Sequence, residues 1–343
     1  MAWKKIHSSE LDSWQQSLHA AGASMFQFPS WLRAFENISF FRPQFLKYEA
    51  ENGFGYCGLL TVNFGIVKAA IVSQGPVLKD VPGKVLEELL DYLKVKGFTF
   101  VRFSGAMADE LLAQRPPYRL IGKKNSFPFY KDVLNHYLVY SEETKEELKA
   151  QFKQAAKNKI NKVEKYDGYR FVTDDEGKYL DQVYELFLRK GNKNGFTYRP
   201  KESYEQLFRN NAQLKFARFY LCFFEDKLVN AILIVRDKER SMNMSGALDE
   251  EQIKDNVSPA VYLHYYAMQH EFFEEHTGTY DLLYSDGAVG TFKKNFNPDH
   301  VEDERLMTVV FEPLIYKLYG RFLLKYASTF KRVGRKAISL IKR

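Results

Sequence analysis

Cysteine is scarce in this 343-residue chain. Cys57 and Cys222 are the only two, and each lies in a stretch where apolar side chains recur as they do in a strand. This excludes a disulfide-rich secreted scaffold and a CxxC metal site. Both residues are predicted to be buried free thiols, which fits a reducing cytoplasm.

Long apolar runs are also missing. The longest, such as residues 228–235, are far shorter than the roughly 20 residues that span a bilayer. No apolar segment of the secretory type follows the first five residues. We therefore expect a globular cytoplasmic protein, whose 45% of hydrophobic residues can form one large core or, more readily, two of ordinary size.

Acidic residues are absent from the last 31 positions, which contain nine Lys or Arg. Residues 1–312 hold 41 basic and 43 acidic side chains, so the formal charge of +7 comes from the end of the chain. A protein that coats nucleic acid would spread positive charge over a folded face instead. The pattern of residues 321–343 predicts a basic amphipathic helix at an anionic membrane surface. The alternatives are a helix packed on the second domain and a tRNA-binding tail.

Familiar catalytic and metal motifs are lacking as well. The seven histidines show no HExxH or paired Cys/His spacing, so no metal site is predicted. Residues 287–296, GAVGTFKKNF, match neither the Walker A motif nor GxGxxG. Because GxSxG is absent too, we do not expect covalent catalysis.

The order strand, strand, helix, strand occurs twice. In the first copy Pro82 opens a helix that ends near Gly97, and in the second Pro259 opens a helix that ends near Gly278. This repetition predicts two α+β domains, each a mixed sheet flanked by helices. We place them at residues 1–140 and 141–312, followed by a basic C-terminal helix or tail at 313–343.

Residues 141–168 are predicted to form one helix between the domains, with Ser141 as its N-cap and Gly168 as its stop. Its apolar stripe contains Leu148, Phe152, Ala156, Ile160 and Val163, beside lysines at 145, 149, 153 and 157. The lysines form either a solvated face or, next to a cleft, a surface that attracts phosphate.

Residues 287–296 follow a strand-like run and are interpreted as a loop softened by glycine. Its lysines are either plain surface residues or cations presented at a strand end. In the second case, a lysine there would bind either a phosphate or a carbonyl oxygen that becomes an oxyanion during the reaction.

The order of these pieces resembles the Fem-type peptidyltransferases and related acyltransferases built from two GNAT-like (acyl-CoA N-acyltransferase-like) domains in tandem. Four segments carry the resemblance: FQFPSWLRAFEN at 26–37, SQGPVL at 73–78, KQAAKNKINKVEKYDGYRF at 153–171 and TYDLLYSDGAVGTFKKNFNP at 279–298. The match covers nearly the whole chain.

The resemblance implies transfer of an aminoacyl or acyl group to an amine of a cell-envelope precursor, a lipid- or nucleotide-linked glycan intermediate, at the inner face of the cytoplasmic membrane. The co-substrate is aminoacyl-tRNA or acyl-CoA, with no bound cofactor or metal. The acyl-CoA alternative modifies an amino sugar of a surface polysaccharide. A rival of another class is a non-catalytic scaffold, associated with membrane or RNA, that keeps the fold.

The resemblance also assigns residues to the site. Lys293 corresponds to the lysine aimed at the donor carbonyl or phosphate, and Asp286, Asp281 and Tyr284 are candidate bases. Asp281 is alternatively structural, and Asp286 alternatively forms an Asx turn. The implied substrate-binding residues are Trp31, Arg33, Lys157, Asn161, Phe292, Lys294 and Phe296, and the implied donor-binding residues are Asn256 and Ser258.

The sequence departs from the Fem pattern at three places. Where the peptidoglycan enzymes often carry a lysine for a diphosphate, this chain has Phe35, and Arg33 is the nearest cation. No long helical arm is predicted between residues 168 and 215. The segment before the helix that Pro259 opens also lacks the glycines of an ordinary acyl-CoA loop. The sequence therefore leaves both donors open.

Overall fold

A computed structural model describes residues 2–38, 40–122, 130, 133–209, 211, 215–253 and 257–320. The chain forms two compact units: Met1–Ser9, Phe40–Val133 and Glu304–Arg343 make unit 1, and Glu10–Ser39 with Leu134–Asp303 make unit 2. The domain boundaries predicted at residues 140 and 312 differ from this division because the chain crosses between the units. The basic helix predicted at residues 321–343 lies outside the described residues.

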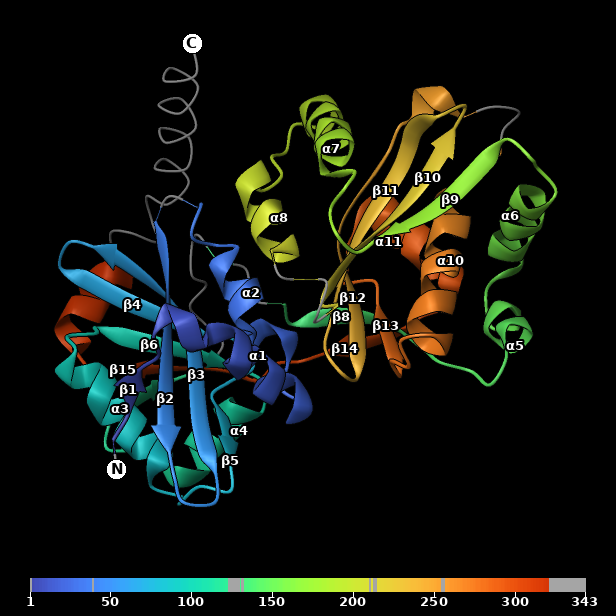
Figure 1. Ribbon diagram of the computed structural model, residues 1–343. Coiled ribbons are helices and arrows are strands. Elements are labelled where there is room, and N and C mark those ends of the chain that lie inside the picture. Colours follow the sequence, from blue (N-terminus) through green and yellow to red (C-terminus); the bar gives the residue numbers. More distant parts are fainter. Residues whose placement is uncertain are drawn as a thin grey trace, which may run out of the picture. The chain divides into compact units, whose positions relative to one another are not determined.

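Unit 1 contains one mixed sheet, in the order β1-β2-β3-β4-β6-β15-β7, with β5 paired to β3. Its strands are β1 (Lys4–Lys5), β2 (Phe41–Glu49), β3 (Phe54–Phe64), β4 (Val67–Val72), β5 (Val77–Lys79), β6 (Phe100–Ser104), β7 (Arg119–Ile121) and β15 (Leu306–Val310). Its helices are α3 (Val85–Val95) and α4 (Ala106–Gln114), and residues 313–320 are also helical. The apolar side of α3 packs against β2, β3, β4 and β6 (Figure 1).

Unit 2 contains a second mixed sheet, in the order β14-β8-β13-β12-β11-β10-β9. Its strands are β8 (Asn135–Tyr140), β9 (Tyr169–Asp174), β10 (Ala217–Phe224), β11 (Lys227–Arg236), β12 (Arg240–Leu248), β13 (Thr279–Asp281) and β14 (Asp299–Glu302). The α-helices are α1 (Leu11–Ala20), α2 (Pro29–Arg33), α5 (Lys145–Ala150), α6 (Gln154–Glu164), α7 (Leu180–Asn194), α8 (Lys201–Phe208), α10 (Ala260–Phe273) and α11 (Gly287–Lys293). Short 3₁₀ turns are η1 (Ser8–Glu10), η2 (Met25–Gln27), η3 (Glu250–Gln252) and η4 (Lys294–Phe296).

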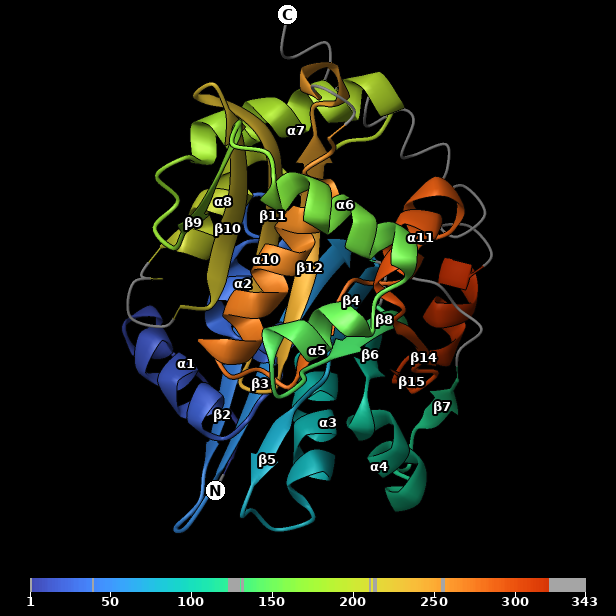
Figure 2. The same ribbon diagram turned by 90° about the vertical axis from the view of Figure 1, so that its right-hand side faces the viewer.

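Helices cover both faces of the second sheet. In Figures 1 and 2, α10 lies on one face with α5 and α6 outside it, and α7 lies on the other face. The helix α10 is apolar around most of its circumference, and Val261, Leu263 and Met268 are buried. Such a helix is expected between two layers rather than at the surface.

The predicted repetition is confirmed. Helix α3 connects β4 to the parallel strand β6, and α10 connects β12 to the parallel strand β13. The other pairings within each sheet are antiparallel. Each unit therefore contains one strand–helix–strand crossover, as the two sequence patterns predicted.

The single helix predicted at residues 141–168 is instead two helices, α5 and α6. The N-cap is Thr144 rather than Ser141, and it forms a capping box with Glu147. The helix is interrupted where the backbone N–H of Lys153 donates to the carbonyl of Asn295. All five residues of the predicted apolar stripe are buried.

Residues 287–296 were predicted to be a loop, and this is wrong, because they form α11 and η4. Gly287, at φ +64°, makes the turn into the helix. Gly290 permits a close approach, since a Cβ there would lie 2.0 Å from the carbonyl oxygen of Ser285. Gly287 therefore serves the backbone turn and Gly290 a close packing contact inside a helical segment, which composition alone does not reveal.

A buried charge cluster ties α10 to the sheet. Glu271 is fully buried and accepts hydrogen bonds from Arg236 Nε (2.8 Å) and Nη2 (2.7 Å) and from Tyr220 Oη (2.6 Å). Ser241 Oγ also donates to Glu271. Removing the carboxylate would leave Arg236 charged in a place without water.

We predict that Glu271→Ala lowers the free energy of unfolding by about 3–5 kcal/mol, measured by urea denaturation. The matched control is Glu274→Ala at the C-cap of the same helix. Glu274 is exposed and pairs with His270 at 2.8 Å, so its loss should cost about 1 kcal/mol or less. Equal losses for the two variants would contradict the structural role of Glu271.

Candidate active site

The strands β12 and β13 separate after a short contact. Their parallel pairing runs from Arg240–Thr279 to Met242–Asp281 and then ends. Just beyond this point the pairing of β12 with β11 shifts, so that Met244 is an extra residue. Bulges of this kind are frequent beside active sites, because they change the direction of a strand. After Asp281 the chain therefore leaves β12 and can turn on that side, while the N–H groups of Leu282 and Tyr284 still donate to β8 at 2.9 and 3.2 Å.

Asp281 fixes the start of that turn. Its side chain is fully buried and accepts a hydrogen bond from the backbone N–H of Leu283 at 2.8 Å. Its other oxygen lies 2.5 Å from His136 Nδ1 and 3.6 Å from Arg240. Leu283 has φ +57°, an uncommon backbone conformation for leucine. As a candidate base, Asp281 is corrected to a structural residue, which is the alternative that the sequence had left open.

Lys293 holds the turn from the other side. Its Nζ donates to the carbonyl of Leu283 at 2.9 Å and to Ser285 Oγ at 2.8 Å. The side chain is 9% exposed, so its ammonium needs these protein acceptors in place of water. The ammonium predicted to face a donor carbonyl or phosphate therefore points into the turn itself.

Tyr284 and Asp286 lie on the outer side of the turn. Tyr284 Oη donates to Asp286 Oδ1 at 2.5 Å, and this hydrogen bond raises the pKa of Tyr284. The Tyr284 ring stacks on His300 at 4.8 Å between centroids. Because the phenol stays protonated near neutral pH, the exposed carboxylate of Asp286 is the better proton acceptor of the two.

The aromatic residues of α11 and η4 anchor the helix. Phe296 is fully buried against Phe152 and His264, so its predicted contact with substrate is corrected to a packing role. Phe292 is half-buried and also packs on His264, whereas Lys294 is exposed. Burial, aided by the charge of Lys293, lowers the pKa of His264 to about 3. His264 is therefore a neutral core residue.

A cavity of about 270 Å³ lies between α6 and the segment before α10. Its lining consists of Ala155, Asn158, Lys159, Lys162, Val257 and Ser258. The α6 residues are spaced i, i+3, i+4 and i+7, so they share one helix face. Ser258 lies in this lining, and its donor-binding role stays a prediction; Asn256 lies outside the described residues. Among the residues that the structure describes, neither Lys159 nor Lys162 has an ion-pair partner.

The lysines of this cavity are not the ones that the sequence singled out. Lys157 donates to the carbonyl of Ala150 at 3.2 Å, and Lys149 pairs with Glu164 at 2.8 Å. Asn161 is exposed on α6 but does not line the cavity. The helix-face spacing of residues 155, 158, 159 and 162 is the signal that could have found the two lysines that line this cavity.

A third group surrounds α2. Trp31 is 2% exposed, so its predicted substrate contact is corrected to packing, and Arg33 lies 3.6 Å from Glu36. The guanidinium of Arg199 lies over the rings of Trp31 and Phe35, at 4.5 and 4.4 Å. Sequence reasoning missed Arg199 because it reaches this place from a distant part of the chain.

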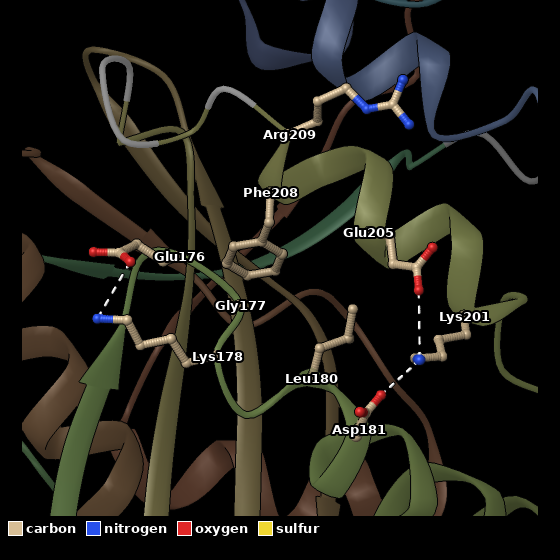
Figure 3. Close-up of a pocket in the computed structure, with 9 residues that line it drawn as sticks. All are labelled: Glu176, Gly177, Lys178, Leu180, Asp181, Lys201, Glu205, Phe208 and Arg209. Atoms are coloured by element: carbon tan, nitrogen blue, oxygen red, sulfur yellow. Dashed lines mark ion pairs between the residues drawn. The ribbon is translucent and has the colours of Figure 1, made fainter.

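Two other cavities have different chemistry. The one in Figure 3, of about 380 Å³, has charges that pair with one another: Lys201 contacts Asp181 (2.6 Å) and Glu205 (3.5 Å), and Lys178 contacts Glu176 (3.2 Å). The other, of about 450 Å³, lies in unit 1 beyond the ends of β4 and β6. It is lined by Gln74, Gly75, Pro76, Leu78, Asp80, Val81, Pro82, Gly83, Ala106, Met107, Glu110 and Gln114, without a cation.

The described residues contain no group of three or more His, Cys, Asp or Glu placed to hold a metal ion. Within the same residues, no helix has the length and apolar character needed to cross a membrane. Cys57 and Cys222 are buried and free, as predicted, and burial raises the pKa of both thiols.

Residues 150–294 match the family described as "Acetyltransferase (GNAT) domain". A comparison with curated proteins finds no match. Among solved structures, FemX is 14% identical with a TM-score of 0.74, and the alignment covers 93% of this chain and 99% of FemX.

Two further structures are similar. The C-terminal domain of a putative lysylphosphatidylglycerol synthetase from Agrobacterium fabrum is 10% identical, with a TM-score of 0.60 and coverage of 93% of this chain and 98% of that domain. L-PGS from Bacillus licheniformis is 13% identical, with a TM-score of 0.58 and coverage of 93% and 97%. These findings confirm the predicted fold class, since the chain has the fold of FemX. The match of residues 150–294 to a GNAT acetyltransferase domain supports the predicted acyltransferase class.

Proposed function

We propose that this acyltransferase forms an amide on an amino group of a cell-envelope precursor, without a covalent enzyme intermediate. The observation that carries the proposal is the turn after β13. There Lys293, Ser285, Tyr284 and Asp286 gather where β12 and β13 separate. An acyl transfer needs a group that stabilises the developing oxyanion and a group that accepts a proton from the amine. The cation–hydroxyl pair supplies the first, and Asp286 supplies the second.

The donor is proposed to place its phosphate groups in the cavity between α6 and the segment before α10. Lys159 and Lys162 supply positive charge, and Ser258 supplies a hydroxyl next to the helix start at Ala260. The exposed N–H groups at a helix N-terminus favour an anion at this place. Acyl-CoA and aminoacyl-tRNA share this chemistry, because both carry an activated acyl group on a phosphate-bearing adenosine compound.

The acceptor is proposed to be a nucleotide- or lipid-linked glycan precursor. At Phe35, where the sequence lacks the expected lysine, Arg199 brings a guanidinium over the ring at 4.4 Å. A guanidinium binds phosphate oxygens in a fork geometry, so it would replace a lysine in contacting a diphosphate. The GNAT match over residues 150–294 also favours a second candidate, an acyl-CoA-dependent N-acyltransferase of an amino sugar.

The end of the chain is proposed to bring the enzyme to an anionic membrane surface at the inner face of the cytoplasmic membrane. Each basic residue near such a surface contributes about 1 kcal/mol. We predict that the full chain floats with anionic liposomes in a salt-sensitive way, and that a version ending at Gly320 does not. Equal flotation of the two versions would rule out this role for residues 321–343.

The reaction is tested by incubating the protein with labelled acyl-CoA or labelled aminoacyl-tRNA and with amino-sugar nucleotides or lipid-linked glycan precursors. We expect an amide product from one donor class. Transfer from neither donor to any acceptor would contradict the proposal and favour a non-catalytic scaffold, associated with membrane or RNA.

The donor cavity is tested by the double variant Lys159→Ala/Lys162→Ala. We expect KM for the donor to rise about tenfold or more with little change in kcat, because the lost contacts lie away from the reacting carbonyl. The matched control is Lys165→Ala, which removes an exposed lysine at the end of α6 outside the cavity. Equal KM values for the double variant and the control would refute the proposed donor position.

A further inference from the structure

We infer that the Ser285 hydroxyl donates a hydrogen bond to the carbonyl oxygen of the acyl group that is transferred. Lys293 then acts through Ser285, as a positioning residue. This inference deepens the proposed function and rests on it. It assigns a catalytic role to a serine that neither the sequence pattern nor the family resemblance had singled out.

The first step of the argument is the direction of the hydroxyl. Lys293 Nζ donates to Ser285 Oγ at 2.8 Å, so one lone pair of that oxygen is occupied. The hydroxyl proton must then point away from the ammonium, because the hydrogens of the Lys293 N–H and the Ser285 O–H would otherwise repel each other. Among the described residues, the Ser285 hydroxyl donates a hydrogen bond to no acceptor. Ser285 is only half-buried, so a ligand can reach it.

The second step is that Lys293 is poorly placed to touch a substrate itself. Its Nζ is held by the Leu283 carbonyl at 2.9 Å as well as by Ser285, and the side chain is 9% exposed. Turning the ammonium outward would break both contacts and leave the turn without its buried donor. A positive charge next to a hydroxyl oxygen nevertheless polarises the O–H bond, which strengthens the hydroxyl as a donor.

The third step is that the backbone of Ser285 is fixed in advance. Asp281 holds Leu283 at 2.8 Å, and the N–H of Tyr284 donates to the carbonyl of Asn135 at 3.2 Å. Gly290 packs so closely on the Ser285 carbonyl that a Cβ would not fit. A hydrogen-bond donor that is fixed before the reaction stabilises an oxyanion without the free-energy cost of reorienting the donor group.

The chemical step balances without any change to the serine. The acceptor nitrogen forms a bond to the carbonyl carbon, and the carbonyl oxygen gains negative charge while Ser285 donates its hydrogen bond. The ester C–O or thioester C–S bond then breaks, and a proton from the amine ends on the leaving alcohol or thiol, relayed by Asp286. Ser285 keeps its proton throughout and never carries the acyl group.

The test is a double-mutant cycle on the transfer reaction with the full chain. Ser285→Ala and Lys293→Met should each lower kcat about 10²–10³-fold, with the KM of the donor changed less than about threefold. The double variant should be no slower than either single variant, because the lysine acts only through the serine. Ser285→Thr keeps a hydroxyl and should recover most of the rate.

The matched control is Thr291→Ala on α11. The Thr291 hydroxyl donates to the carbonyl of Gly287 at 3.1 Å on an exposed part of the helix, so its loss should change kcat less than about twofold. Circular dichroism and thermal unfolding establish that each variant is folded. If Lys293→Met does not fold, the comparison of Ser285→Ala with Ser285→Thr decides alone.

Four results would overturn the inference. A kcat unchanged in Ser285→Ala would show that the hydroxyl is not used, while transfer by the unmodified protein would leave the proposed function standing. Multiplicative losses in the double variant would show that Lys293 contacts the substrate directly. An acyl group found on Ser285 by intact-mass and peptide analysis would make the serine a nucleophile. An inactive unmodified protein would overturn the proposed function and this inference together.

Discussion

The short parallel pairing of β12 with β13 is the constraint on which the candidate site depends. After Asp281 the chain no longer pairs with β12 and keeps backbone hydrogen bonds to β8, while Leu283 adopts a left-handed conformation. Such a turn persists only where its surroundings hold it. Asp281, at the end of β13, accepts a hydrogen bond from the N–H of Leu283, and Lys293, on α11, donates one to the carbonyl of Leu283. The buried ammonium thus joins a strand end to a helix and fixes the hydroxyl between them.

The two units share a crossover but differ in the chemistry at its end. In unit 1 the cavity beyond β4 and β6 is lined by carboxylates, amides and apolar side chains. In unit 2 the corresponding end of β13 has a buried lysine, a serine and an exposed aspartate, and two further lysines line a cavity beside α6. Positive charge and hydroxyl donors suit a phosphate-bearing acyl donor. The GNAT match lies within unit 2, in agreement with this difference.

Local patterns were enough to predict much of the fold. The helices α3 and α10, the strands around them and the apolar stripe of α5 and α6 follow from periodicity and from Pro and Gly signals. The unit boundaries were not predictable in this way, because β15 joins the first sheet through pairing with β6 and β7. Pairing between segments about 200 residues apart leaves no local trace in one sequence.

The candidate site was predictable only in part. The segment that contains Lys293, Asp286 and Tyr284 was found, but its glycines suggested a loop instead of α11. The direction of the Lys293 ammonium depends on where the Leu283 carbonyl lies, which is a tertiary fact. Arg199 and the lysine pair of α6 were missed because their surroundings come from other elements. Sequence therefore singled out the segment of the candidate site, and packing decided which of its atoms face outward.

The central claim is that the Lys293 ammonium organises the turn from Leu283 to Ser285. Native-state amide hydrogen exchange of Lys293→Met tests it most directly. The account predicts that the amides of Leu283 and Tyr284 exchange about tenfold faster or more, while those of Leu233 and other β11 residues keep their rates. Unchanged exchange at Leu283 and Tyr284 in a folded variant would contradict the account.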